Sequence, residues 1–235
     1  MDEGLNQSSL AEQARAALRE QIISGKLKPN ERIDLAELAK KWSISPTPLR
    51  DAVRNLEMSG LVHIHPRRGV FVATLDRTGL RETFELRIAL EGMAARLTTP
   101  RLAPEQALAT LERYRRTGAA RGPQKATLLV AVDNLVHDLV FENCGNQRLQ
   151  RIMESVRDLV AWSKQSIIRN VPEPYDATLP EHIAICEALV SRDPDAAESM
   201  MRRHLLNSLA RLNDFFDRHA RPDNAAPPAG EAALT

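Results

Sequence analysis

Apolar residues recur at helical spacing through most of the chain, and strand-like alternation is confined to one short region. The first helix is predicted to begin at Ser9, where a capping-box pattern starts, and to end at Gly25. A second helix is predicted from Asp34, and a third from Ser45 with Pro46 in the first helical position. All three helices are short and carry apolar residues, and in the first and third these residues fall on one face.

Two short strands are predicted directly after the third helix, over residues 61–65 and 70–74. The turn between them contains Arg67, Arg68 and Gly69, so the hairpin has a basic tip. Three helices followed by a hairpin is the element order of a winged helix-turn-helix.

The pattern is helical again from about residue 77, with proline and glycine at the breaks. We therefore predict a mainly α protein: a winged helix-turn-helix domain over residues 9–75 and an all-α bundle of six or seven helices over residues 76–220. Residues 1–8 are expected to be flexible, and the Pro/Ala-rich tail 221–235 to be disordered. The expected helices of the bundle are 77–98, 104–117, 125–143, 146–169, 179–191 and 194–219.

Composition narrows the class of protein. The 235 residues are 43% hydrophobic and 27% charged, which is typical of a globular protein, and the apolar runs fall short of the ~18 residues of a membrane span. The polar, acidic start is unlike a signal peptide. Two cysteines, Cys144 and Cys186, are too few for a disulfide framework. We expect a cytoplasmic protein with no membrane partner.

Charge is uneven although the whole chain carries a net charge of only +1. Residues 40–69 contain six basic and two acidic side chains. Arg50 and Arg54 are four residues apart and share the helix surface opposite the apolar stripe. Ser45 and Thr47 lie at the helix start, where free N–H groups suit a phosphate. The pattern favours a helix that reads duplex DNA, although a basic surface without a ligand and a protein-docking module remain alternatives.

Four residues of the second domain suggest a metal site. Asp133 and His137 are spaced i, i+4, which on one continuous helix places them on the same side, among Leu129, Val130, Val136 and Val140. His182 and His204 lie in the apolar stripes of two later helices. One carboxylate and three neutral imidazoles would suit Zn²⁺, Ni²⁺ or Mn²⁺. The alternative is that each histidine is an ordinary core residue with a hydrogen-bond partner.

The segment SISPTPLRDAV and its surroundings, about 65 residues in all, resemble the N-terminal domain of the GntR family of bacterial transcription regulators. The resemblance implies that Ser45, Thr47 and Arg50 lie at the DNA surface of the recognition helix, with Arg67, Arg68 and Gly69 in the wing. The family usually has an arginine, normally a DNA contact, where this chain has Pro46. A changed DNA contact is therefore expected there.

The segments FELRIALEGMAARL, DNLVHDLVFENCGNQRL and PEHIAICEALVSRDPDAAESMMRRHL resemble the FCD effector domain of the FadR subfamily. That resemblance implies that Asp133, His137, His182 and His204 bind a divalent metal ion, whose open positions take water or oxygens of a small organic acid. It also implies that Arg87 contacts the effector. From spacing alone, an Arg87–Glu91 pair at i, i+4 is an equal alternative.

Together these features predict a homodimeric transcription regulator that binds a palindromic operator in double-stranded DNA and responds to a small carboxylate, and they favour a repressor over an activator. The rival is a metal-dependent hydrolase or lyase that uses the Asp/His site. Against it, the sequence has no HExxH spacing, nucleophile motif or phosphate-binding glycine loop.

Overall fold

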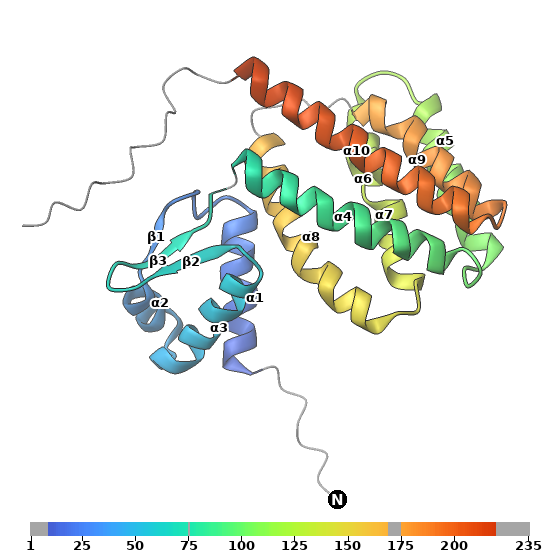
Figure 1. The fold of residues 1–235 in the computed structure, drawn as a ribbon. Coiled ribbons are helices and arrows are strands. Elements are labelled where there is room, and N and C mark those ends of the chain that lie inside the picture. Colours follow the sequence, from blue (N-terminus) through green and yellow to red (C-terminus); the bar gives the residue numbers. More distant parts are fainter. Residues whose placement is uncertain (1–8, 75, 169–174, 220–235) are drawn as a thin grey trace, which may run out of the picture.

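The computed structural model describes residues 9–74, 76–168 and 175–219. Two separate hydrophobic cores lie within these ranges, one in a small N-terminal unit of three helices and a sheet, the other in a bundle of seven described helices. Figure 1 shows the small unit in blue and cyan beside the larger bundle. The predicted flexible start, the predicted break near residues 171–174 and the predicted disordered tail lie outside the described residues.

Helix α1 (Leu10–Ile23) begins as predicted: the Ser9 hydroxyl accepts the Glu12 N–H at 3.2 Å, and the Ser9 N–H donates to the Glu12 carboxylate at 2.8 Å. Helices α2 (Leu35–Trp42) and α3 (Pro46–Met58) follow, and a left-handed residue, Ser43, ends α2. The buried face of α3, as the spacing indicated, consists of Leu49, Ala52, Val53 and Leu56.

A three-stranded antiparallel sheet completes the N-terminal unit, with the strand order β1-β3-β2. Strands β2 (Val62–His65) and β3 (Gly69–Val72) form the predicted hairpin, with Ile64 opposite Val70. Strand β1 (Arg32–Ile33) was not predicted. Two residues are too few to show alternation, so no pattern along the chain indicates this strand.

The bundle comprises α4 (Arg77–Thr98), α5 (Pro104–Ala119), α6 (Gln124–Val132), α7 (Leu135–Asn143), α8 (Gln147–Ile168), α9 (Tyr175–Val190) and α10 (Pro194–His219). Helices α4 and α10 run side by side (Figure 1). They approach so closely that a Cβ at Gly92 would lie 2.8 Å from Cγ of Arg202. A larger residue at position 92 would therefore displace Arg202.

The single helix predicted over residues 125–143 is wrong, because α6 ends and α7 begins at a turn over Asp133 and Asn134. The Tyr114 hydroxyl accepts the backbone N–H of Val136 at 3.0 Å, which satisfies a free donor in the first turn of α7. A long-range contact of this kind has no signature in local spacing. The predicted inward position of Val130 is also wrong, since its exposed fraction is 58%.

Helix α8 connects the two units. Its Trp162 is 1% exposed and belongs to the hydrophobic core of the N-terminal unit, with Leu159 packed beside it. Leu159 lies against Gly60, just beyond the end of α3. Arg19 of α1 donates from Nε to the Asp158 carboxylate at 2.7 Å. One segment of α8 therefore fixes how the N-terminal unit sits on the bundle.

Candidate metal centre and DNA-binding surface

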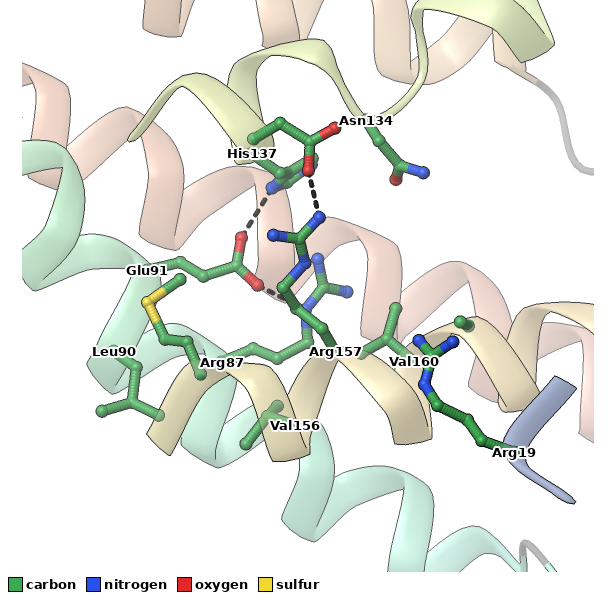
Figure 2. A pocket seen from close by; sticks show the side chains of 12 residues that line it. Arg19, Arg87, Leu90, Glu91, Asn134, His137, Val156, Arg157 and Val160 are labelled. Carbon is green, nitrogen blue, oxygen red and sulfur yellow. Dashed lines mark hydrogen bonds and ion pairs between the residues drawn. The ribbon is translucent and has the colours of Figure 1, made fainter. Parts of the chain in front are cut away.

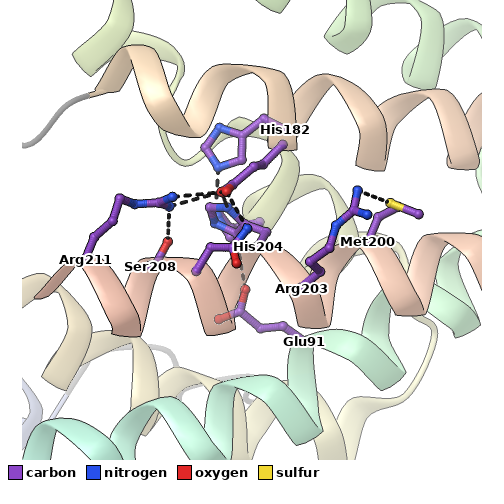
Figure 3. A network of polar contacts seen from close by, with 10 residues as sticks. Glu91, His182, Met200, Arg203, His204, Ser208 and Arg211 are labelled. Carbon is purple, nitrogen blue, oxygen red and sulfur yellow. Dashed lines mark hydrogen bonds and ion pairs between the residues drawn. The ribbon is translucent and has the colours of Figure 1, made fainter. Parts of the chain in front are cut away.

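Three histidines from three helices converge inside the bundle. His137 comes from α7, His182 from α9 and His204 from α10, and each offers a ligand nitrogen within 4.8 Å of the other two. His182 and His204 are 1% and 4% exposed, and His137 is slightly more open. Figure 3 shows His182 and His204 facing each other from their two helices. The sequence placed these side chains on inward faces, and the fold brings them together.

Two carboxylates determine which ring nitrogens of the cluster are available to bind a metal. Nδ1 of His204 lies 2.7 Å from the Glu181 carboxylate, and Nδ1 of His137 lies 2.6 Å from the Glu91 carboxylate. Burial lowers the pKa of His204 to about 4, although the hydrogen bond to Glu181 opposes that shift. Neutral His204 therefore donates from Nδ1 to an ionised Glu181, which leaves a lone pair on Nε2. This carboxylate–histidine arrangement is the one that orients imidazoles on metals.

Both carboxylates stay ionised, although Glu91 is buried and Glu181 is partly buried. Burial opposes ionisation of Glu181, but hydrogen bonds from His204, Arg211 and Asn207 outweigh it and lower the pKa to about 2. Arg211 and Ser208 lie beside this group in Figure 3. Burial likewise opposes ionisation of Glu91, and the charge of Arg87, together with hydrogen bonds from His137 and Arg87, lowers its pKa well below the usual range.

The spacing of the nitrogens fits a metal. Nε2 of His182 and Nε2 of His204 are 3.3 Å apart. Two imidazole nitrogens at roughly 2.0–2.1 Å from one tetrahedral Zn²⁺ lie about 3.4 Å apart. The alternative for this pair is a hydrogen bond from Nε2–H of His182 to Nε2 of His204, which would make the cluster a structural one.

Asp133 is not part of this cluster among the described residues. The turn between α6 and α7 removes the i, i+4 geometry that would have placed it beside His137. Asp133 nevertheless lies near the cluster, as its effect on Tyr114 indicates. Burial is the main cause that raises the pKa of Tyr114, and the charge of Asp133 is a lesser cause. The Tyr114 ring in turn contacts His182, with 5.2 Å between the ring centroids.

Arg87 makes the intrahelical pair that its spacing allowed. Its Nε donates to the Glu91 carboxylate at 2.6 Å, and both side chains are 7% exposed. Glu91 thus joins Arg87 to His137, and Arg87 also lies over the Phe84 ring at 5.0 Å. The pair does not exclude contact with a ligand, because a guanidinium has five N–H donors.

A cavity of about 150 Å³ opens beside His137 (Figure 2). Its polar lining includes Arg19, Arg87, Glu91, Asn134 and Arg157. Its apolar wall comes mainly from α4 and α8, through Leu90, Met153, Val156, Val160 and Ala161. Arginines beside an imidazole cluster make this cavity suited to a small anion.

A second candidate surface lies at the start of α3. Ser45 precedes the helix and makes no side-chain cap. Because Pro46 and Pro48 carry no N–H, Thr47 is the residue among the first three helical positions that offers a backbone donor. Thr47, Arg50 and Arg54 are all exposed, and within the described residues Arg50 forms no ion pair. Arg54 has a loose partner in the described part of the chain, Asp51 at 3.9 Å.

The hairpin presents the remaining predicted DNA-binding residues. Arg67 and Arg68 are exposed at the turn between β2 and β3. Arg67 has φ +62° and Gly69 φ +109°, so the turn depends on left-handed backbone at both positions, and glycine supplies it without steric cost at position 69. Both arginines therefore extend away from the N-terminal core.

Sequence reasoning missed three residues that the geometry makes relevant: Glu181, Arg211 and Arg19. Glu181 contacts His204 across 23 positions, Arg211 donates to Glu181, and Arg19 enters the cavity from the other unit. Only the position of Glu181 next to His182 could have drawn notice, and it does not indicate a contact with His204. Separately, no helix in the described part of the chain has the length and apolar character to span a membrane.

Residues 10–72 match the model of bacterial regulatory proteins of the gntR family, and residues 82–207 match the FCD domain model. The chain is 29% identical over 204 residues to the uncharacterized HTH-type transcriptional regulator YdhC of Bacillus subtilis (strain 168), covering 85% of this chain and 89% of that protein. It is 25% identical over 205 residues to the HTH-type transcriptional repressor GlaR of Escherichia coli (strain K12), covering 82% and 90%.

Solved structures show the same fold. The E. coli protein McbR/YncC superimposes with a TM-score of 0.69 at 20% sequence identity, covering 89% of this chain and all of that one. A GntR transcriptional regulator from Rhodococcus sp. RHA1 gives the same TM-score at 19% identity, covering 88% and 99%.

Proposed function

Because this chain belongs to the FCD-containing, FadR-type branch of the gntR family, we propose that a small carboxylate bound at a metal centre controls its affinity for DNA. Membership of the family makes the protein a DNA-binding transcriptional regulator and not an enzyme. The observation that carries the proposal is the convergence of three imidazoles, two of them held through Nδ1 by carboxylates, beside an arginine-lined cavity. The rival hydrolase or lyase has no support from the family.

We place DNA at the exposed start of α3. Ser45 and Thr47 would meet a phosphate near the helix N-terminus, while Arg50 and Arg54 would meet base edges or phosphates in the major groove. Arg67, Arg68 and the backbone at Gly69 would contact a neighbouring phosphate or the minor groove. With Pro46 at the first helical position, no basic side chain is available there, and this favours an operator that differs from those of relatives with arginine.

His137, His182 and His204 would hold a divalent cation, Zn²⁺, Ni²⁺ or Mn²⁺, through nitrogen ligands. Asp133 stays a candidate for a further ligand through a small rotation of the turn at the end of α6. The metal would supply a Lewis-acid position for carboxylate or hydroxyl oxygens. Arg87 would add a charge-assisted hydrogen bond to the same acid while Glu91 holds the guanidinium in place.

Two copies of the chain would read a palindromic operator, as two-fold symmetry requires. An exposed apolar stripe on α4 supports a homodimer: Leu86 and Met93, two turns apart, are 50% and 41% exposed. A cytoplasmic repressor released from DNA by its acid is the form that we favour, since GlaR is named a repressor. The acid must bind the two arrangements of the dimer unequally to have this effect.

Metal analysis of the purified protein tests the centre. We expect about one divalent ion per chain in the wild type, and a loss of most of it in His182→Ala and His204→Ala. His63→Ala is the matched control, because this histidine is exposed on β2 and far from the cluster in sequence and fold. Equal, near-zero metal in all four proteins would show that the histidines form a hydrogen-bonded structural cluster.

A further inference from the structure

We propose that Arg19, a residue of the DNA-binding domain, is a ligand-binding residue of the effector cavity and selects acids that carry a second carboxylate. This inference rests on the proposed function, since it takes the cavity beside His137 as the effector site. The inference adds to the proposed effector site a residue from the DNA-binding domain, and it names dicarboxylic acids as the class of ligand. The observation behind it is that the cavity wall is shared between the bundle and α1.

The cavity is incomplete without the N-terminal domain. Most of its lining comes from α4, α7 and α8 of the bundle, whereas Arg19 reaches it from α1. In Figure 2, Arg19 and His137 lie on opposite sides of the view, with Arg157 between them. A ligand anchored at His137 and Arg87 therefore has Arg19 as a basic group on a different wall.

The guanidinium of Arg19 keeps N–H donors that its ion pair does not use. Its Nε donates to Asp158 at 2.7 Å and its Nη2 lies 2.5 Å from the same carboxylate oxygen. A guanidinium carries five N–H donors in a fixed fork, so this contact leaves several for an anion. The side chain is 35% exposed, which leaves it open to solvent and to the cavity.

The other arginine in this part of the cavity is held more firmly. Arg157 forms an ion pair with Asp138 and lies 4.5 Å over the centroid of the Phe141 ring. Ring stacking and the ion pair together fix its guanidinium. Arg19 is therefore the cation best able to turn toward an incoming carboxylate.

The volume of the cavity limits the length of the acid that can bind. About 150 Å³ is the volume of a cavity that holds one benzene molecule, so the space suits a short acid of about four carbons. An acid with one carboxylate, when it binds Arg87, has no second carboxylate to offer to Arg19. An acid with a carboxylate at each end, such as succinate, can engage Arg87 and Arg19 together.

Binding at Arg19 would act directly on the DNA-binding domain. Val156 and Val160 of α8 line the cavity, while Asp158, Leu159 and Trp162 of the same segment hold the N-terminal domain. A carboxylate that shares Arg19 with Asp158 alters the link between α1 and α8. Leu159 of α8 lies against Gly60, just beyond the end of α3, so a shift of α8 would be passed to the DNA-binding helix through this contact.

Calorimetric titration of the full-length, Zn²⁺-loaded protein with succinate and with butyrate tests this role. We expect the wild type to prefer succinate by about tenfold or more, as one added charge-assisted contact allows. The double variant R19Q/D158N removes the guanidinium without leaving a buried carboxylate unpaired, and its preference should fall to near unity. R15Q is the matched control, because Arg15 lies one turn earlier on α1 and is absent from the cavity lining. Both arginines also line a separate, more open groove between α1 and α8, so a loss of preference in R19Q/D158N alone points to the cavity.

The outcomes separate this inference from the function on which it rests. Thermal melts of each variant first establish that the fold is intact. If both acids bind and R19Q/D158N keeps the wild-type preference for succinate, Arg19 is not a ligand residue, while the effector site stands. If neither acid binds the wild type, the effector site and the inference both fail. Loss of preference in R19Q/D158N but not in R15Q supports the assignment.

Discussion

Two carboxylates, one buried and one partly buried, set the chemistry of the histidine cluster at the level of single residues. Glu181 and Glu91 accept from Nδ1 of His204 and of His137, which directs the Nε2 lone pairs toward the centre of the cluster. The sequence identified the three histidines from their apolar surroundings. It could not identify these carboxylate partners, because Glu181 contacts His204 across 23 positions and Glu91 contacts His137 across 46.

The shifted pKa of His204 predicts a pH dependence of stability in metal-free protein. The folded pKa is about 4, below the ordinary value of 6.5, so between these limits the unfolded chain binds a proton that the folded protein excludes. The free energy of unfolding should therefore fall as the pH drops from about 6.5 toward 4, by up to about 1.4 kcal/mol per pH unit from this residue. Urea unfolding of chelator-treated protein at several pH values measures it.

His204→Gln should flatten this slope, and His63→Gln should leave it unchanged because His63 is exposed. Below pH 4.5 a second loss is expected, since the depressed pKa of Glu181 stabilises the fold only while its carboxylate is ionised. An identical slope for wild type and His204→Gln between pH 6.5 and 4 would contradict this account of the cluster.

Among the secondary-structure elements, α8 has the widest role, because it lines the cavity and also completes the core of the DNA-binding domain. Its helical spacing predicted the helix but gave no sign that Trp162 is buried in the other domain. Spacing reports which face of a helix is apolar, and not which partner covers it. The same limit explains why the turn at Asp133 and Asn134, fixed by the distant Tyr114, was read as continuous helix.

Truncation of Trp162 tests the role of α8 in joining the domains. Trp162→Ala should lower the free energy of unfolding by about 3–5 kcal/mol, because a fully buried indole leaves a large cavity. Urea unfolding followed by far-UV circular dichroism measures the change. Ile152→Ala, on the same helix but 53% exposed, should change it by about 0.5 kcal/mol or less. Equal effects of the two substitutions would show that α8 is not anchored in the DNA-binding domain.

For the whole molecule, the sequence predicted the order of the elements well. Capping patterns and glycine and proline breaks are local signals, and they located α1, α3 and α4 to within a few residues. The resemblance to the GntR family with an FCD domain is confirmed by the family models. The individual DNA contacts, the metal and the assembly depend on partners outside the chain, and they stay predictions.

The proposed homodimer predicts that charge on the exposed face of α4 separates the subunits. In L86E/M93E, two carboxylates would have to be buried at the interface, so the protein should become monomeric. Light scattering coupled to size-exclusion chromatography measures the mass. Leu108→Glu on α5, at an equally exposed position, should remain dimeric. A wild-type protein that is monomeric at micromolar concentration, or a dimer unaffected by L86E/M93E, would show that α4 is not the interface.

Fluorescence anisotropy of a labelled duplex from the region upstream of the chain's own gene measures the coupling between the cavity and DNA. We predict that Zn²⁺-loaded wild type binds this duplex with a steep salt dependence, and that a small carboxylate weakens the affinity by about tenfold or more. His204→Ala should bind the duplex but not respond to the acid. A DNA affinity that no small carboxylate changes in the wild type, or that changes equally in His204→Ala, would contradict control through the histidine cluster.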